Sequence, residues 1–591
     1  MGDVVVTYRA HAQLVDKLAA TKCYRIPLAA PGQSGYFRWF TPPRRDWVYT
    51  NIMSPAARVL MTMMGRGMYV DTEEVARLET HLPKLIKGMR EKFVEEDPRI
   101  GAWMGQCNKD AQQEARDAGK PVGEDDVLWH LDLENKEHLR QLLFDALGIV
   151  PVRLTKGGRK RYGDDVVTQR EMMTAEFIKF NKESTPEQVA DGVDKMLRKY
   201  TAIDKFTLNA LAVEHVSLRS MLEYRKTYKL YTTYVRPLRN YTNTIVDKKE
   251  RKKDPHLCYD DCIHASFMLT GTRGGRLSCR DPNLQQLPRD GEVKSMFVSR
   301  FGDRGCMYQA DLSQIELRLM AAACGDPTMV KAYFDKEDLH SLTTSRIFNV
   351  PLEHFSKDYA LFLQKNKRDK EAKQLGENRQ VGKTVNFLTG YGGGAFGLQN
   401  VLAAKGIFKD LEECEDIIRA FFDSYPSLRA WLQLYKGFIQ QRHCALSIFG
   451  RVRVFEEVSG SDEEAKAKAL RAGCNHVIQS TASDMMLIAL FVIEQEMRSA
   501  GLESLLVSTV HDSLLIDAIR EELSRVHEIV SYTLNNFNLV LPAVLGQDFD
   551  TSWMLVPFAG DCDVGLDYLH VRKIPETNVD WDKLLAPSEA A

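Results

Sequence analysis

The stretch from Cys306 to Ala323, CMYQADLSQIELRLMAAA, changes its hydrophobic period in the middle, and this change constrains the fold more than any other feature of the chain. Its first residues alternate as a β-strand does, whereas the apolar residues from Leu312 to Ala322 recur at helical spacing. Asp311 therefore lies where a predicted buried strand gives way to a helix. A carboxylate held at the end of a rigid strand is well placed to bind a metal ion.

A second aspartate, Asp512, lies between two short apolar runs that predict a β-hairpin within Leu505 to Asp517. Two aspartates at neighbouring strand ends would hold a pair of Mg²⁺ ions, which favour carboxylate oxygen and suit in-line displacement at phosphorus. Taken separately, each aspartate is more often a helix cap or a turn residue. The metal hypothesis therefore depends on the residues between them.

Arg379, Lys383, Phe387 and Tyr391 follow one another at steps of four between the two aspartates. On a helix these side chains form one stripe, with two cations followed by two aromatic rings. We expect the cations near the N-terminal end of that helix, where its dipole also attracts anions, so that a triphosphate binds there and a base lies against the rings. The alternative is a solvated basic turn followed by an aromatic core contact.

Three segments, DLSQIELR at Asp311, RQVGKTVNF at Arg379 and VHDS at Val510, together resemble the catalytic motifs of the family A DNA polymerases, the DNA polymerase I type. Their order and rough separations also match, and further similar segments are GGRLSCRDPNLQQLP, YPSLRAW, FGRVRVF and NHVIQSTASD. The resemblance runs from about Ser54 to near the C-terminus. It implies an α+β right-hand fold with an antiparallel-sheet palm, helical fingers and a helical thumb. It also implies template-directed addition of deoxynucleotides to a primer 3′ end, with release of pyrophosphate.

The resemblance also assigns roles to individual residues. It implies two Mg²⁺ ions held by Asp311, Asp512 and the backbone carbonyl of Leu312, with Lys383 neutralising the phosphates and protonating the leaving group. The incoming deoxynucleotide is expected to contact Arg379, Lys383, Phe387, Tyr391, His340, Gln314 and Glu316. Primer–template DNA is expected to contact Arg276, Asn283, Gln285, Arg471, Asn475, Gln479 and His511 on its minor-groove side, where base edges offer similar acceptors.

Some of these residues have a structural alternative. Glu316 matches a family glutamate that excludes a 2′-hydroxyl, but Ser313 to Glu316 also has the pattern of a capping box at a helix start. Asn283 would equally cap a turn, and a hydrogen bond from Gln479 to His511 would satisfy a buried polar network. The basic segment Lys156 to Arg161 is predicted to be a glycine-hinged loop that grips duplex phosphates, with a solvated surface as the alternative.

The chain departs from the family pattern at several positions. Leu388 stands where a glycine usually follows the phenylalanine of the stripe, and Phe387 in place of tyrosine predicts poor use of dideoxynucleotides. Ser513 replaces a common third carboxylate, and Gln380 replaces an often basic residue. A lysine-rich stretch at 353–376 is longer than the family commonly has, and it suggests an added DNA or partner contact.

The resemblance, together with an expected multi-lobed chain of 591 residues, gives the following predicted domains: 1–50 an N-terminal connector or remnant domain, 51–255 the thumb, 256–325 the first part of the palm, 326–473 the fingers, and 474–591 the second part of the palm and the C-terminus. The net charge of −2 gives no global sign of nucleic-acid binding, so a DNA groove must come from local clusters of basic side chains.

Proofreading members of the family carry an Asp-x-Glu metal motif before the polymerase, and Asp71 to Glu73 has that form. Asp71 opens a helical pattern, however, so we interpret it as an N-cap with Glu74 at the capping-box position and expect no proofreading. The tempting zinc spacing of His256, Cys258, Cys262 and His264 is set aside, because strand alternation would divide these side chains between two faces.

Other features bear on location and partners. The 11 scattered cysteines fit a reducing compartment, no signal peptide is visible, and the apolar run Met485 to Ile493 is too short to span a bilayer. We expect a monomeric cytoplasmic protein without a membrane partner, and we favour a phage as its source. The sequence does not show whether a separate exonuclease or processivity factor assists it. Two rival hypotheses are a single-subunit RNA polymerase and a non-catalytic DNA-binding relative.

Overall fold

The computed structural model describes residues 25–33, 36–43, 45–123, 125–149, 154–162, 166–181, 183–238, 261–288, 291–403, 405–510 and 512–586. The chain forms two compact units. Unit 1 comprises Met1–Leu78, Thr233–Leu398 and Asp410–Ala591, and unit 2 comprises Glu79–Thr232 and Gln399–Lys409. Each unit is described by itself.

A five-stranded antiparallel sheet lies at the centre of unit 1, in the order β10-β11-β7-β12-β13. Its strands are β7 (Gly305–Leu312), β10 (Leu505–Val510), β11 (Ser513–Ile519), β12 (Gly560–Gly565) and β13 (Arg572–Lys573). The middle strand, β7, is buried except at Gln309 and Asp311, which are half-buried. The predicted strand at Cys306 and the predicted hairpin around Asp512 are therefore confirmed.

The change of period after Asp311 corresponds to a sharp turn of the backbone. Ser313 donates its backbone N–H to Ala559, and Gln314 has the left-handed backbone angle φ 51°. Helix α14 (Ile315–Cys324) begins at the next residue and buries almost all of its side chains. Asp311 is thus fixed at a strand end immediately before a buried helix.

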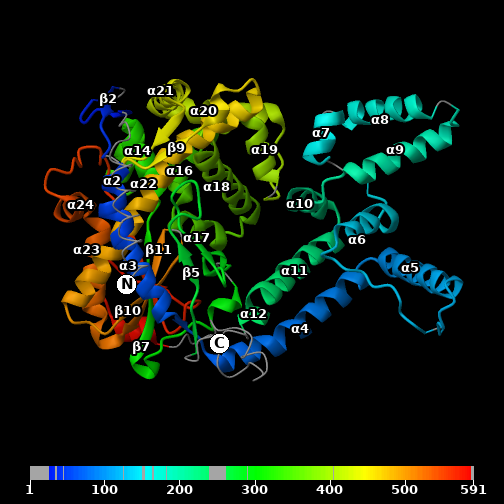
Figure 1. The fold of residues 1–591 in the computed structure, drawn as a ribbon, viewed down its shortest axis with the longest axis horizontal. Coiled ribbons are helices and arrows are strands. Elements are labelled where there is room, and N and C mark those ends of the chain that lie inside the picture. Colours follow the sequence, from blue (N-terminus) through cyan, green and yellow to red (C-terminus); the bar gives the residue numbers. More distant parts are fainter. Residues whose placement is uncertain are drawn as a thin grey trace, which may run out of the picture. The chain divides into compact units, whose positions relative to one another are not determined.

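Helices cover this sheet and extend beyond it (Figure 1). Helix α3 packs on β10, and α23 packs on β11 and β12. The larger helices of unit 1 are α3 (Ser54–Arg66), α14, α15 (Pro327–Phe334), α16 (Leu339–Phe348), α17 (Lys357–Lys365), α18 (Asp369–Thr389), α20 (Leu411–Ser424), α21 (Pro426–Arg442), α22 (Glu463–Ser499), α23 (Leu523–Asn535) and α24 (Phe537–Leu545).

Unit 1 also contains short elements around these helices. The paired short strands are β1 (Ile26–Ala29) with β2 (Phe37–Phe40), β3 (Met68–Tyr69) with β4 (Cys262–Ile263), β5 (Ser266–Met268) with β6 (Ser278–Arg280), and β8 (Cys444–Leu446) with β9 (Val452–Val454). The short helices are α2 (Arg45–Val48), η1 (Tyr49–Met53), α12 (Arg236–Leu238), η5 (Leu284–Gln286), η6 (Glu292–Lys294), η7 (Gly302–Arg304), η8 (Leu352–Phe355), η9 (Glu456–Ser459), η10 (Arg520–Glu522) and α25 (Trp581–Leu585).

Helix α22 contains the apolar run Met485 to Ile493. Among the described residues it is long and apolar enough to cross a membrane, but 89% of its most apolar window is buried inside the protein. Three of the boundaries between the units fall inside helices. These are the α-helices α4 (Thr72–Glu95) and α19 (Ala395–Ala403) and the π-helix η3 (Tyr231–Val235).

The start of α4 confirms the N-cap prediction for Asp71. One carboxylate oxygen of Asp71 accepts the backbone N–H groups of Glu73 at 2.9 Å and Glu74 at 3.2 Å. Glu74 does not complete a capping box, because the backbone N–H of Asp71 donates to Met296 instead. Its carboxylate binds Arg77, which with Ser295 lowers the pKa of Glu74.

The regular elements in the described part of unit 2 are helices, apart from an isolated bridge between Leu154 and Thr201. Its helices are α5 (Pro98–Asp117), α6 (Lys136–Gln141), η2 (Leu142–Ala146), α7 (Lys156–Tyr162), α8 (Val166–Phe180), α9 (Pro186–Tyr200), α10 (Lys205–Glu214) and α11 (Val216–Leu230). Asn135 is the N-cap of α6, which continues directly into η2, and Gly148 has φ 65° after the end of η2.

The prediction that Lys156 to Arg161 forms a loop is wrong, because this segment is helix α7. Tyr162 ends the helix inside a core made with Leu154 and Met173. A Cβ at Gly158 would lie only 3.0 Å from Leu154 and Tyr200, so this glycine permits close packing and does not serve as a hinge. The apolar anchor of α7 outweighs the low helix propensity of its two glycines.

Candidate active site

The two predicted metal ligands, Asp311 and Asp512, come together in unit 1. Ser513, the residue after Asp512, lies directly opposite Asp311 in the pairing of β11 with β7. The backbone N–H of Leu312 donates to the carbonyl of Asp512 at 2.9 Å. Both aspartates line one cavity of about 600 Å³, together with Gln285, Gln286, Leu287, Lys294, Gln309, Val510, Ser513, Asp561, Asp563, Tyr568 and Val571.

Two of these lining residues, Asp561 and Asp563, were not predicted as site residues. Asp561 on β12 lies directly opposite Asp311, on the side of β7 away from Ser513. It forms an ion pair with Lys573. Burial raises the pKa of Asp563, and the charge of Asp561 raises it further while Lys573 opposes both. The alternation in GDCDVG could have placed both carboxylates on one face, but the sequence does not show which strand lies beside β7.

Ser513 stands where the family commonly has a third carboxylate, and its hydroxyl donates to the carbonyl of Val510 at 2.9 Å. Among the described residues, no three His, Cys, Asp or Glu side chains are grouped closely enough to hold a metal ion by themselves. Two hard carboxylates suit Mg²⁺, which usually keeps water and takes only one or two protein carboxylates beside substrate phosphates. The donor set therefore fits that ion.

Three of the four stripe residues, Arg379, Lys383 and Phe387, lie on α18, but the helix differs from the prediction at both ends. Arg379 and Lys383 lie about three to four turns after its first residue, Asp369. The prediction that the helix dipole assists anion binding there is wrong, because that effect falls off within the first turn. Tyr391 lies beyond the last helical residue, Thr389, where the chain turns through Gly392 at φ 80°.

The cations of the stripe differ in their surroundings. Arg379 donates to Asp338 at 2.7 Å and to the hydroxyl of Ser341 at 3.2 Å. Burial disfavours ionisation of Asp338, but hydrogen bonds from Ser341 and Arg379 and the charge of Arg379 outweigh it and lower its pKa to about 2. Lys383 is half-buried, and no carboxylate in the described part of the chain forms an ion pair with it.

His340 is buried on α16, which packs against α18 (Figure 1). Burial lowers its pKa to about 4, with Asp338 opposing and Lys383 and Arg379 assisting. Its Nδ1 lies 3.0 Å from the amide nitrogen of Asn386, so Nδ1 accepts and Nε2 carries the proton. His340 is therefore a neutral hydrogen-bond donor, and its ring lies 5.5 Å from that of Phe387.

The capping-box alternative for Glu316 is wrong. Helix α14 begins at Ile315, and the preceding residue Gln314 makes no side-chain cap. The Glu316 carboxylate instead accepts hydrogen bonds from Arg276 and from the hydroxyl of Tyr391. Burial, with the charge of Glu316, raises the pKa of Tyr391. Three predicted site residues from distant segments thus form one polar cluster.

The described residues that are predicted to contact DNA come from the loop before β6, from the region of η5 and from α22. Asn283 accepts the backbone N–H of Gln285 at 3.2 Å, as the turn-cap alternative requires, and the Gln285 amide donates to Thr509 at 3.2 Å. Arg471, Asn475 and Gln479 lie on α22, where Asn475 has a buried Oδ1 with no hydrogen-bond partner among the described residues. His511 lies outside the described residues, so its predicted bond with Gln479 stays a prediction.

A buried ion pair that the sequence did not suggest holds the segment before Arg276. Arg451 donates to Asp484, whose side chain is fully buried. A Cβ at Gly275, which has φ 81°, would lie 2.6 Å from the Arg451 side chain, and Ser483 donates to the carbonyl of Gly275 at 2.7 Å. Arg451 and Ser483 therefore fix the backbone next to Arg276.

These elements can be compared with known proteins. Residues 176–554 match the family model described as DNA polymerase family A, which covers more than half of the chain. The chain belongs to DNA polymerase family A.

This family A chain is similar to several curated relatives. It is 26% identical over 553 residues to a DNA polymerase of Bacillus phage SP01, covering 89% of this chain and 51% of that protein. It is 30% identical over 370 residues to DNA polymerase I of Chloroflexus aurantiacus, covering 62% of this chain and 35% of that protein. The chain spans about half or less of the length of the curated relatives it matches.

A solved structure shows the fold of this family A chain. The structure is described as the POL domain of Pol1 from M. smegmatis in complex with DNA primer-template and dNTP. The TM-score is 0.62 at 22% identity, covering 89% of this chain and 71% of that chain. The predicted α+β right-hand fold is confirmed, whereas the domain boundaries stay predictions.

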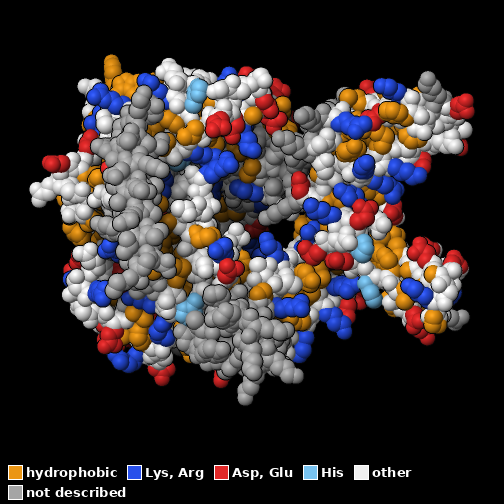
Figure 2. Space-filling model, in the orientation of Figure 1, with side chains coloured by type: hydrophobic (Ala, Val, Ile, Leu, Met, Phe, Trp, Pro, Cys, Tyr) orange, Lys and Arg blue, Asp and Glu red, His pale blue; other side chains and the backbone are white. Residues whose placement is uncertain are grey.

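The lysine-rich stretch at 353–376 forms η8, α17 and the first turns of α18 in this family A chain. Arg368 pairs with Glu371 and Lys373 with Glu377. Figure 2 shows Lys and Arg side chains gathered over the part of unit 1 where α16 and α18 lie. A contact of this stretch with DNA or a partner stays a prediction.

The prediction that no zinc site forms at His256, Cys258, Cys262 and His264 also stays a prediction, because His256 and Cys258 lie outside the described residues.

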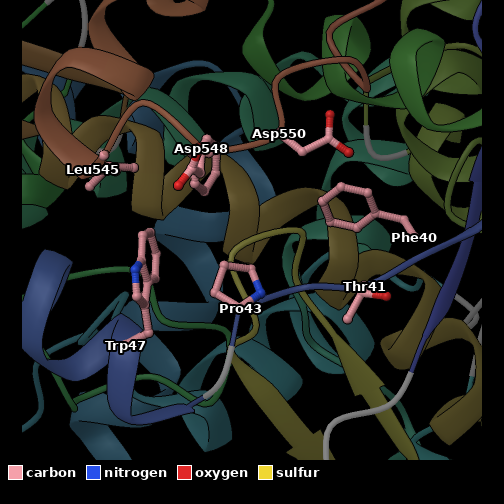
Figure 3. Close-up of a pocket in the computed structure, with 9 residues that line it drawn as sticks. Phe40, Thr41, Pro43, Trp47, Leu545, Asp548 and Asp550 are labelled. Atoms are coloured by element: carbon pink, nitrogen blue, oxygen red, sulfur yellow. The ribbon is translucent and has the colours of Figure 1, made fainter.

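A second cavity of about 370 Å³ contains none of the predicted site residues. Figure 3 shows Trp47 and Pro43 on one side of it and Asp548 and Asp550 on the other. Trp47 stacks on Phe549, with ring centroids 5.6 Å apart. Asp550 accepts a hydrogen bond from Ser552, which lowers its pKa against the opposing effect of burial. This cavity provides a useful control for mutations in the carboxylate cavity.

Proposed function

We propose that this chain is a DNA-directed DNA polymerase that extends a primer by two-metal nucleotidyl transfer. The observation that carries the proposal is the meeting of Asp311 and Asp512 in one cavity of a chain that belongs to family A. Family membership implies a metal-dependent reaction, and we assign the metal to two Mg²⁺ ions. When bound, these ions would lower the pKa of the primer 3′-hydroxyl and stabilise the leaving pyrophosphate.

The residues of the chain would bind and orient the substrates. Asp311 and Asp512 would hold the metal ions with the backbone carbonyl of Leu312, and Arg379 and Lys383 would neutralise the triphosphate. Lys383 has no carboxylate partner within the described residues, so its charge is available for a phosphate and for proton delivery to the leaving group. The neutral His340 would donate a hydrogen bond from Nε2 to the same phosphates.

Selection of a deoxynucleotide would depend on Glu316. Its carboxylate is held by Arg276 and Tyr391, so it cannot easily move away from a 2′-hydroxyl placed against it. Phe387 and Tyr391 would lie against the base, and Gln314 would contact the nucleotide from the end of β7. A fixed carboxylate at this place favours a DNA polymerase over the alternative of a single-subunit RNA polymerase.

We assign primer–template DNA and deoxynucleoside triphosphates as the substrates. The M. smegmatis relative was solved with DNA primer-template and dNTP, which supports this assignment. Arg276, Gln285, Arg471, Asn475 and Gln479 would line the minor-groove side of the terminal base pair, where acceptors are shared by all correct pairs. Asp71 caps a helix, so the Asp-x-Glu pattern at Asp71 to Glu73 gives no support for an exonuclease site there.

Primer extension on a long template tests the proposal. Wild-type protein with Mg²⁺ is expected to extend the primer with dNTPs and much less with NTPs, whereas Asp512→Asn is expected to be inactive. Asp548→Asn, in the second cavity, provides the matched control and should retain wild-type activity. Extension by Asp512→Asn at the wild-type rate would exclude this site, and a preference for NTPs would favour the RNA polymerase hypothesis. No extension by wild-type protein would favour the non-catalytic hypothesis.

A further inference from the structure

Asp338, which immediately precedes α16, contacts several residues that the proposed function assigns to the nucleotide. One carboxylate oxygen accepts the backbone N–H of Ser341 at 3.2 Å, its hydroxyl at 2.6 Å, and the guanidinium of Arg379 at 2.7 Å. The other oxygen accepts the side-chain amide of Gln314 at 3.2 Å. Asp338 therefore connects the end of β7, the start of α16 and the middle of α18.

These contacts fix the plane of the Arg379 guanidinium. Its Nη2 donates to Asp338, and its Nε donates to the Ser341 hydroxyl, which itself donates to Asp338. The three groups form a closed ring of hydrogen bonds on the first turn of α16. A long arginine side chain that is held at two nitrogens loses less freedom when it binds a phosphate.

The same carboxylate also supports Gln314, the left-handed residue three positions after Asp311. The amide nitrogen of Gln314 donates to Asp338, and its amide oxygen accepts the Tyr333 hydroxyl at 3.3 Å. Gln314 is thus held at both ends of its amide. His340, two residues after Asp338, lies on the same first turn of α16, so three predicted nucleotide contacts depend on this short segment.

We propose that Asp338 is a positioning residue that sets Arg379, and with it Gln314, for the incoming triphosphate. This inference rests on the proposed function, because it assumes that these two residues contact the nucleotide. Asp338 would act through Arg379 and would not touch the substrate. Its contribution would appear in the binding of the triphosphate more than in the chemical step.

The test is steady-state incorporation of one nucleotide by Asp338→Asn. Asparagine is as good an N-cap as aspartate, so the substitution retains the cap of α16 and removes the charge that holds Arg379. We expect the KM for dNTP to rise about tenfold while kcat stays within about twofold. Asp410→Asn, which changes the N-cap of α20 without contacting a predicted nucleotide residue, should alter neither parameter.

A double-mutant cycle separates positioning from a general effect on structure. If Asp338 acts through Arg379, Asp338→Asn should change the KM of an Arg379→Gln enzyme by less than about twofold. Equal effects in both backgrounds would overturn the proposal, as would an unchanged or lowered KM in the single variant. Ser341→Ala removes the bridging hydroxyl, retains both charges, and should raise KM by a smaller factor.

The controls also distinguish this inference from the proposed function. Wild-type protein that does not incorporate nucleotides would contradict the proposed function itself. Active wild-type protein with an unchanged KM in Asp338→Asn would contradict only the inference. A purely structural role for Asp338 would give two results together. The melting temperature of Asp338→Asn would fall, and Ser341→Ala would change kcat and KM no more than the control Asp410→Asn does.

Discussion

The strand end that carries Asp311 and the helix that carries Arg379 hold their side chains in different ways. Asp311 is placed by backbone hydrogen bonds, since β7 pairs along its length with β11 on one side and β12 on the other. Arg379 lies in the middle of α18 and depends on Asp338 and Ser341, about forty residues earlier in the chain. The comparison indicates that pairing of the backbone places a short side chain on a strand, whereas the position of a long side chain on a helix depends on the groups around it.

Asp311→Asn provides the strongest test of how the end of β7 holds its side chain. Loss of a metal-binding carboxylate is expected to lower kcat at least about a thousandfold, whereas backbone pairing should leave the melting temperature within about 2 °C of wild type. Primer extension and thermal unfolding measure the two effects. Ser513→Ala, at the position opposite Asp311, is the control and should lose little activity. A large loss of stability in Asp311→Asn would show that its side chain also holds the strand.

Acid pH should lower the stability of the protein through His340, which lies on α16 against α18. Burial lowers the pKa of this histidine from 6.5 to about 4. Between these values the unfolded chain binds more protons than the folded chain, so stability falls as the pH falls from about 6.5 to about 4, by roughly 3 kcal/mol for this group. Denaturant unfolding across this range measures the effect. His340→Gln should flatten the curve.

Substitution of two glycines of α18 distinguishes the effect of close packing on stability from the effect of helix propensity. A Cβ at Gly382 would lie 2.1 Å from the Thr344 hydroxyl of α16, whereas a Cβ at Gly376 would meet nothing within 4 Å. Gly382→Ala is therefore expected to cost about 1–3 kcal/mol and to raise the KM for dNTP, because α18 must move away from α16. Gly376→Ala should stabilise the protein by about 0.5–1 kcal/mol. Equal effects in thermal unfolding would contradict the close packing of α16 with α18.

Glu316→Ala should produce a smaller effect on catalysis than Asp311→Asn. Removing the carboxylate opens space for a 2′-hydroxyl, and ribonucleotide incorporation relative to deoxynucleotide is expected to rise about tenfold. Tyr391→Phe removes only the hydroxyl that donates to Glu316 and should change this ratio less. Single-nucleotide incorporation with matched dNTP and NTP measures both variants. A fall in stability with an unchanged ratio would favour a structural role for Glu316.

The sequence predicted the strand side of the site well. A change of period at Asp311 and two apolar runs around Asp512 are local patterns, and each was sufficient to place its residue at a strand end. The neighbour β12 was not predicted, because strand order depends on tertiary pairing between segments about 250 residues apart. Asp561 was therefore missed, although its alternation with Asp563 is visible in the sequence.

The helix side was predicted less well. Steps of four correctly placed Arg379, Lys383 and Phe387 on one helix, but the spacing does not show where a helix begins or ends. Tyr391 fits the same spacing and still lies beyond the helix, because the glycines after Thr389 turn the chain. The sequence indicates that Asp338 can cap a helix, but it does not indicate its role beside Arg379. The ion pair joins α16 to α18, and only the fold brings these two helices together.

The central place of β7 in the sheet has a consequence for how this protein can change over time. A strand with partners on both sides cannot slip by one residue without turning its whole set of side chains to the opposite face. The side chains at neighbouring positions such as Ser513 and Asp561 can therefore be replaced by others while Asp311 stays in the same position. Such a frame allows the surrounding sequence to diverge while the position of Asp311 is retained.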